Sequence, residues 1–183
     1  TEIPQEDGLY VSNSGDTSLA GCTFLRGGSQ GAQWAHRELP YQQYDADNMP
    51  YASVPFHTVY DCHFVDCAEG GTRPSFNLTY FTPGTSSFAG MLNIVNSSFV
   101  CDWTSPRQDG KHSTGALVVT PSQGNKPLRE GYNMMHEVRV ANSLFDFTAG
   151  DRSIAAIRST DEVLFEDCAF IARNHQQPFI TID

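Results

Sequence analysis

Positive charge is scarce in this 183-residue chain, which has 11 Lys and Arg residues against 21 Asp and Glu residues and a formal net charge of −10. A surface with this balance repels phosphate backbones, so we expect no nucleic-acid partner. The sequence also lacks an apolar run of membrane-spanning length, so we expect no membrane insertion. It begins at Thr1 without a signal peptide, and we therefore expect a processed or excised piece of a longer chain.

Helical patterns are also missing, because no long stretch repeats its apolar residues with a period near 3.6. Turn-forming residues are frequent instead, with 15 Gly and 10 Pro. This combination is typical of a β-rich chain with many loops. The length suits a single domain or segment over residues 1–183 with a real hydrophobic core.

The pattern that is present is an internal repeat. Five times the chain shows Asn, Asp or Gly, then Cys or Ser, then any residue, then Phe, at 21–24, 61–64, 96–99, 142–145 and 167–170. Each instance follows a segment that alternates like a strand, and Asn, Asp and Gly tolerate the left-handed conformation of a tight bend. We expect two buried columns, one of Phe24, Phe64, Phe99, Phe145 and Phe170 and one of Leu19, Val59, Ile94, Val140 and Phe165. The side chains of Asp61, Asn96, Asn142 and Asp167 should bond along the stack at equivalent buried bends.

Two segments carry a family resemblance, GLYVSNSGDTSLAGCTF at 8–24 and SIAAIRSTDEVLFEDCAF at 153–170. They resemble rungs of right-handed parallel β-helix proteins of the pectin-lyase-like superfamily. The resemblance implies an all-β fold, a right-handed parallel β-helix (solenoid) of about five coils. Further short strands are expected at 8–11, 116–119, 153–157 and 179–182, and three long insertions at 27–52, 66–87 and 102–134 should emerge on one side.

The insertions hold the candidate ligand-binding residues, because loops that cluster on a rigid scaffold are the usual place for binding. Aromatic and polar side chains alternate there in a way that suits sugar rings or a protein partner. These candidates are Trp34, His36, Arg37, Tyr41, Tyr44, Asp45, Asp47, Trp103, Arg107, Lys111, His112 and Arg129. The alternative is that the aromatics only pin the loops to the flank of the fold. Asp45 and Asp47 could hold calcium, but no EF-hand glycine or distal glutamate accompanies them, so we expect a solvated loop without a cofactor.

Cysteine chemistry is predicted to be structural. Cys22, Cys62 and Cys168 share one inner column with Ser97 and Ser143, while His63 faces outward, which argues against a zinc site. Cys67 and Cys101 follow the Phe corners of successive units and could form a disulfide. Of two glycosylation sequons, Asn77 could carry a glycan, whereas Asn96 belongs to the corner.

No catalytic motif accompanies the repeat. Polygalacturonase-like members of the superfamily carry Asn-Thr-Asp, Gly-His-Gly and Arg-Ile-Lys motifs that this sequence lacks, and no base among Arg107, Lys111 and Arg129 has a recognisable spacing from the carboxylates. We therefore expect a non-catalytic β-helix segment on the outside of a cell or virion that presents loops for adhesion, carbohydrate binding or assembly. The alternative is a polysaccharide lyase or glycoside hydrolase. The expected partners are a polysaccharide or glycan, or neighbouring subunits. We also expect the rest of a longer chain or another subunit to cover at least one end of the segment.

Overall fold

The computed structural model describes residues 7–12, 16–25, 30–36, 56–67, 76–80, 90–101, 116–121, 135–150, 154–158, 160–175 and 178–182. Their regular structure is entirely β-strand, and no helix occurs in these ranges. Nothing in the described part of the chain could therefore cross a membrane as a helix.

The strands form three sheets in which every pair of neighbours is parallel. Sheet A contains β1 (Asp7–Ser12), β4 (Gln30–His36), β7 (Phe76–Tyr80), β10 (Leu117–Pro121), β13 (Ala155–Ile157) and β16 (Ile180–Ile182). Sheet B contains β2 (Thr17–Ala20), β5 (Phe56–Tyr60), β8 (Met91–Val95), β11 (Met135–Ala141) and β14 (Thr160–Glu166). Sheet C contains β3 (Thr23–Leu25), β6 (His63–Val65), β9 (Ser98–Cys101), β12 (Leu144–Gly150) and β15 (Ala169–His175).

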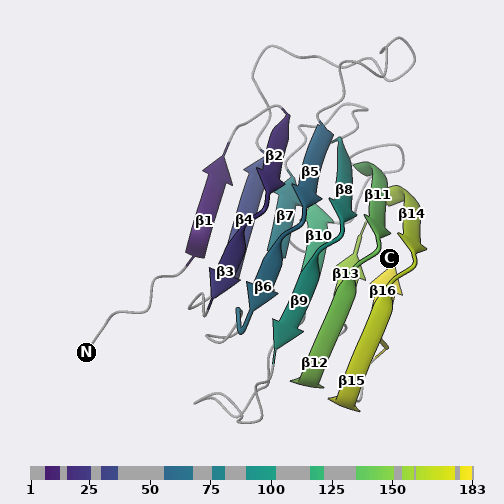
Figure 1. The fold of residues 1–183 in the computed structure, drawn as a ribbon. Helices are drawn as coiled ribbons and strands as arrows, with labels where there is room; N and C mark the ends of the chain where they lie inside the picture. The colour runs from purple at the N-terminus through teal and green to yellow at the C-terminus, as the bar shows by residue number, and fades with distance from the viewer. Residues whose placement is uncertain are drawn as a thin grey trace.

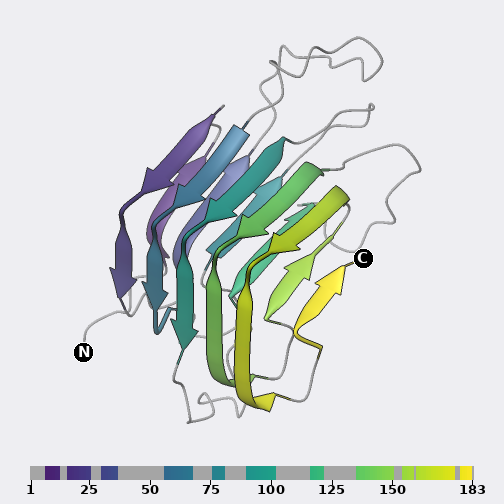
Figure 2. The ribbon, with the colours of Figure 1, turned by 45° about the vertical axis from the view of Figure 1, so that its right-hand side comes forward.

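Neighbours within a sheet are three strands apart in the chain, so the chain visits sheets A, B and C in turn (Figure 1). Sheets B and C follow each other around a corner, and sheet A lies behind them (Figure 2). Because alternate residues of a strand face opposite sides, β5 and β8 bury every second side chain between the sheets. The core lies inside this three-sided stack, and its corners are where outward-facing side chains can gather.

The phenylalanines of the repeat form one column through the core. Consecutive rings from Phe24 through Phe64, Phe99 and Phe145 to Phe170 have centroids 4.8–4.9 Å apart and lie within 9° of parallel. This spacing matches the distance of about 4.8 Å between neighbouring strands. The second column is also in register, since the strand pairing joins Leu19, Val59, Ile94, Val140 and Phe165 in order.

The bends between sheets B and C are left-handed, as the repeat predicts. The backbone φ is +52° at Asp61 and Asn96, +49° at Asn142 and +48° at Asp167, and Gly21 takes the same place with +62°. Asn96 Nδ2 donates to Asp61 Oδ1 at 3.1 Å, which is a bond along the stack. The expectation of buried side chains was wrong, because Asn96, Asn142 and Asp167 are exposed. At each left-handed bend the backbone turns toward the core after the bend residue, and the side chain of that residue points to solvent.

The segment DCHFVDC at 61–67 contains two such bends, because Asp66 also has a positive φ of +50°. Cys62 and Cys67 each follow one of these aspartates and are fully buried. Each Sγ donates to the carbonyl oxygen two residues earlier, at 3.3 Å to Tyr60 and 3.6 Å to Val65. The cysteines are therefore architectural, and each closes a bend from inside.

The predicted disulfide between Cys67 and Cys101 is not formed in this structure, in which Cys67 is a thiol. Its Sγ lies 3.4 Å from the carbonyl oxygen of Phe24, on the β3 side of β6, whereas Cys101 belongs to β9 on the other side. The thiol of Cys67 is thus directed away from the strand that carries its expected partner. The side chain of Cys101 lies outside the described residues.

Serine hydroxyls satisfy the backbone inside two of the corners. Ser97 Oγ donates to the carbonyl oxygen of Val95 at 3.0 Å and accepts the N–H of Cys62 at 3.2 Å. Ser143 Oγ likewise accepts the N–H of Ser97 at 3.2 Å. Buried backbone groups need such partners, since an unsatisfied one costs free energy.

We expect Ser97→Ala to lower the free energy of unfolding by about 1–3 kcal/mol, because the Cys62 N–H loses its acceptor in a buried site. Ser97→Cys should cost less, since Cys62 and Cys168 already donate from the same position to the carbonyl two residues earlier. Urea denaturation of both variants measures the difference. Equal stability of Ser97→Ala and the parent would refute this role of the hydroxyl.

Two of the intervals assigned to insertions hold strands that the sequence prediction missed. These are β4 within 27–52 and β7 within 66–87, whereas β10 within 102–134 matches the strand expected at 116–119. Ala32 and Trp34 of β4 face the core, and the strand pairs with β1 and β7. Sheet A therefore passes through all three intervals. Apart from 66, 67 and 116, their remaining residues lie outside the described ranges.

Candidate functional site

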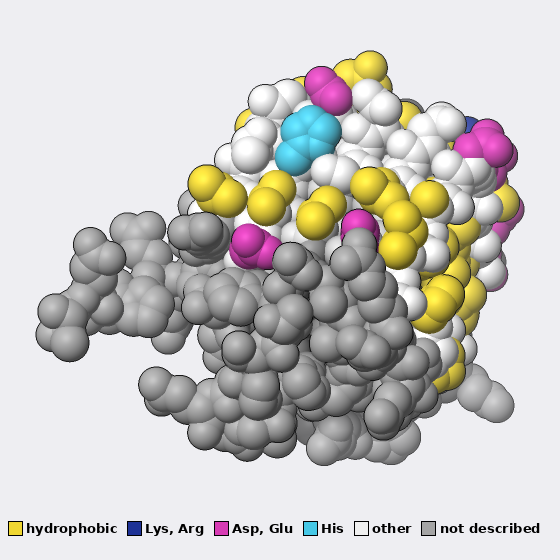
Figure 3. Space-filling model, turned by 60° about the horizontal axis from the view of Figure 1, so that its bottom comes forward, with side chains coloured by type: hydrophobic (Ala, Val, Ile, Leu, Met, Phe, Trp, Pro, Cys, Tyr) yellow, Lys and Arg dark blue, Asp and Glu magenta, His cyan; other side chains and the backbone are white. Residues whose placement is uncertain are grey.

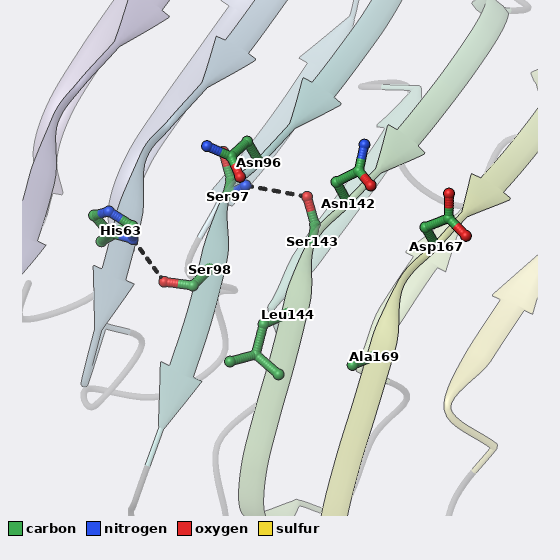
Figure 4. Close-up of a pocket in the computed structure, with 9 residues that line it drawn as sticks. All are labelled: His63, Asn96, Ser97, Ser98, Asn142, Ser143, Leu144, Asp167 and Ala169. Carbon is green, nitrogen blue, oxygen red and sulfur yellow. Dashed lines mark hydrogen bonds between the residues drawn. The ribbon is translucent and has the colours of Figure 1, made fainter.

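A hollow of about 430 Å³ lies on the outer surface at the corner between sheets B and C (Figure 4). We call it the corner groove. Its lining residues come from four successive corners and are His63, Asn96, Ser97, Ser98, Asn142, Ser143, Leu144, Asp167 and Ala169.

The repeat itself builds this groove. The left-handed residue of each corner points outward, and the residue two positions later opens a sheet-C strand and also faces out, because the Phe after it faces in. Two parallel rows result. The first contains Asp61, Asn96, Asn142 and Asp167, and the second contains His63, Ser98, Leu144 and Ala169. Each row offers one side chain about every 4.8 Å along the stack.

One hydrogen bond links a pair of neighbours in each row. His63 Nδ1 and Ser98 Oγ lie 2.8 Å apart, and Asn96 bonds to Asp61 as described above. Asn142 and Asp167 project outward from their corners without such a bond between them (Figure 4). The groove therefore offers amide, hydroxyl and imidazole groups that can donate and accept, and a carboxylate that accepts.

An apolar row runs beside these two rows on the outer face of sheet C. Strand register aligns Leu25, Val65, Val100, Asp146 and Ile171, so four of the five positions are apolar. Leu25 is 66% exposed and Ile171 is 43% exposed. Figure 3 shows a row of hydrophobic side chains across this face of the molecule. The surface thus combines an apolar strip with a few polar groups, as ligand sites do.

The charge of the groove is negative. Asp167 is the one carboxylate among its lining residues, and neither Lys nor Arg lines it. Asp61 adds a second carboxylate at the edge of the first row. The described part of the groove therefore has nothing to offset the charge of an anionic ligand.

The arrangement of these carboxylates bears on catalysis. The corners of Asp61 and Asp167 are three strand spacings apart, or about 14 Å. Glycoside hydrolases that act through two carboxyl groups hold them about 5–9.5 Å apart. This pair is too widely separated for that chemistry.

The His63–Ser98 pair has the separation of a base and a nucleophile. Acyl transfer also needs donors for the developing oxyanion. The backbone N–H groups of Ser98, Leu144 and His63 all donate within the stack, to Cys62, Ser97 and Cys22 respectively. No carboxylate among the described residues hydrogen-bonds to His63. Among the described residues, the pair therefore has neither the orienting carboxylate nor the free backbone donors of a catalytic triad.

The structure corrects one predicted ligand-binding residue. Trp34 lies in β4 and is 2% exposed, and its ring lies 5.5 Å from that of the buried His57. It packs in the core and cannot contact a ligand outside. The backbone of His36 ends β4. The other candidates lie outside the described residues: Arg37, Tyr41, Tyr44, Asp45, Asp47, Trp103, Arg107, Lys111, His112 and Arg129.

The corner groove was not among the predicted ligand-binding sites, although its lining residues belong to the repeat motif. One signal in the sequence could have predicted the groove: the residue two positions after each bend residue faces outward. Within the described ranges, no three His, Cys, Asp or Glu side chains lie close enough together to hold a metal ion. Comparison with protein-family models, curated proteins and solved structures found no match for the chain.

Proposed function

We propose that the chain is a segment of a right-handed parallel β-helix of about five coils, similar to those of the pectin-lyase-like superfamily. The parallel sheets with neighbours three strands apart and the continuous Phe column support this fold. The hydrophobic residues of the first and last rows pack only partly buried against the core, among them Leu9, Phe24, Phe165 and Phe170. They favour a segment whose ends are covered by the rest of a longer chain or by a neighbouring subunit.

The function that this geometry supports best is non-catalytic binding of an extended glycan along the corner groove, on the outside of a cell or virion. This proposal rests on the geometry of the corner groove. Its two outward-facing rows carry polar groups at most of their positions along a rigid core, and an apolar strip runs beside them. A sugar chain presents hydroxyl groups at its edges and C–H groups on its faces, so it can use both kinds of surface at successive positions.

The charge of the groove favours a neutral glycan. A polyuronate would meet Asp167 and Asp61 without a compensating cation among the lining residues, on a chain with a net charge of −10. Such like charges oppose binding. Hydroxyl groups of a neutral sugar can instead donate to the carboxylates and accept from the amides of Asn96 and Asn142.

The alternative function is a polysaccharide lyase or a glycoside hydrolase. A lyase of the superfamily's kind needs a basic residue to abstract a proton, and neither Lys nor Arg lines the described groove. The separation of about 14 Å between the corners of Asp61 and Asp167 likewise disfavours a two-carboxylate hydrolase. These observations favour binding over cleavage.

Calorimetry against a panel of neutral and acidic oligosaccharides tests the proposal. We expect neutral chains to bind and acidic chains to bind much more weakly, and we expect neutral binding to change little between low and high salt. Asn142→Gly should weaken binding about 3- to 10-fold through the loss of one or two hydrogen bonds. This change keeps the bend intact, because Gly tolerates a φ of +49°.

Thr58→Ala, on the outer face of sheet B, is the matched control and should leave affinity unchanged. Reducing ends and unsaturated products are assayed on the same panel. Release of either product would replace the binding function with the enzymatic alternative. Binding of acidic chains alone, or equal affinity of Asn142→Gly and the parent, would show that the corner groove is not the site.

A further inference from the structure

The inner corner column contains one position where two thiols are neighbours, Cys22 and Cys62. Register places them opposite each other, because Leu19 pairs with Val59 and Thr23 pairs with His63. Two backbone hydrogen bonds flank the pair, from Gly21 N–H to the Tyr60 oxygen at 3.0 Å and from His63 N–H to the Cys22 oxygen at 2.8 Å.

Both side chains also have the same orientation. Cys22 Sγ donates to the carbonyl oxygen of Ala20 at 3.3 Å, and Cys62 Sγ donates to that of Tyr60 at 3.3 Å. Neighbouring parallel strands hold Cα atoms about 4.8 Å apart. This lies inside the range of about 4.4–6.8 Å that disulfides span.

We propose that Cys22 and Cys62 are a disulfide-forming pair that links the first two corners covalently when the protein meets a low-molecular-weight disulfide such as oxidised glutathione. This goes beyond glycan binding and does not depend on it. The extracellular setting that we propose is one in which disulfides persist.

The reaction proceeds in two exchange steps. Cys22 is partly exposed, whereas Cys62 is fully buried, so the Cys22 thiolate attacks the reagent first and expels one glutathione thiolate. The Cys62 thiolate then attacks the Cys22 sulfur and expels the second glutathione. Two protein thiols lose two electrons and two protons in total, and one glutathione disulfide becomes two glutathione thiols.

Burial raises the pKa of the Cys62 thiol. Backbone hydrogen bonds to Cys22 and Tyr60 oppose this rise in part, and the Cys22 thiol adds to it. Because the attacking species is the thiolate, the second step should be slow at neutral pH and accelerate as the pH rises. The mixed disulfide at Cys22 should therefore be an observable intermediate at pH 7.

The other described cysteines supply matched controls. Cys168 occupies the same bend position and also has a pKa raised chiefly by burial, but its neighbour in the column is Ser143. Serine fills this position at two corners, so Cys22→Ser and Cys168→Ser should both fold.

The test treats the reduced full chain with glutathione disulfide at pH 7 and pH 9 and follows intact mass and cross-linked peptides. We expect a loss of about 2 Da, a peptide joining Cys22 to Cys62, and a higher midpoint of thermal unfolding, by about 10 °C. Cys168→Ser should react like the parent, and Cys22→Ser should form no such link. A lasting mixed disulfide at Cys22 without cross-linking at pH 9, or a link between other cysteines only, would overturn the proposal.

Discussion

Phe99→Ala should lower the free energy of unfolding by about 3–5 kcal/mol, the largest effect of a single side chain in the column. Phe99 is fully buried, and its ring lies between Phe64 at 4.8 Å and Phe145 at 4.9 Å. Truncation removes contacts on both faces and leaves a cavity that rigid sheets on either side cannot close. Urea denaturation followed by circular dichroism measures the change.

Phe24→Ala is the matched control for this prediction. Phe24 has a stacking partner on one side, Phe64 at 4.9 Å, and it is only partly buried. We expect it to cost about half as much as Phe99→Ala. Equal losses for the two variants, or a loss below about 1 kcal/mol for Phe99→Ala, would mean that the column is not continuous.

Trp34→Ala should also destabilise the protein by about 3–5 kcal/mol, because the indole is buried between sheets A and B beside His57. The folded protein should bind the neutral glycan with the affinity of the parent, since Trp34 faces the core and the corner groove lies outside. Denaturation and calorimetry on the same sample separate the two effects. Trp34→Phe keeps an aromatic ring and should cost considerably less.

The opposite pattern would restore Trp34 as a ligand-binding residue. Unchanged stability of Trp34→Ala together with lost glycan affinity would place the indole on the surface. It would also return the interval 27–52 to the role of a binding loop.

The corner motif could be predicted because its chemistry is local. A left-handed bend selects Asn, Asp or Gly, and the Phe that follows must face inward, so each corner leaves the same four-residue signature. Five copies predicted both columns and the parallel stacking. The orientation of the corner side chains is not determined by the local sequence, and the expectation of buried amides was wrong for Asn96 and Asn142.

Two strands of sheet A, β4 and β7, were harder to predict because they contain no corner motif and lie inside intervals that were interpreted as insertions. The aromatic in β4 was interpreted as a binding residue, although Ala32 and Trp34 alternate as the inward face of a strand does. Chain segments between the corners differ in length, so no fixed spacing marked these strands. Only their pairing with β1 and β10 shows that they belong to the stack.

The corner groove could not be predicted residue by residue. His63, Ser98 and Leu144 are common surface residues, and 35 and 46 positions separate them in the chain. They become neighbours only through the register of sheet C. The sequence predicts that the residue two positions after each bend faces outward. These residues form a groove only because four corners are aligned in the stack.

Chemical-shift mapping of backbone amides with a neutral oligosaccharide tests the central claim most directly. We predict that the shifts fall on the corner residues 61–63, 96–98, 142–144 and 167–169, and that Thr58 and Arg139 on the outer face of sheet B stay unchanged. Shifts that avoid these corners and gather on sheet A or sheet B, or no shifts with any neutral chain of the panel, would contradict the account.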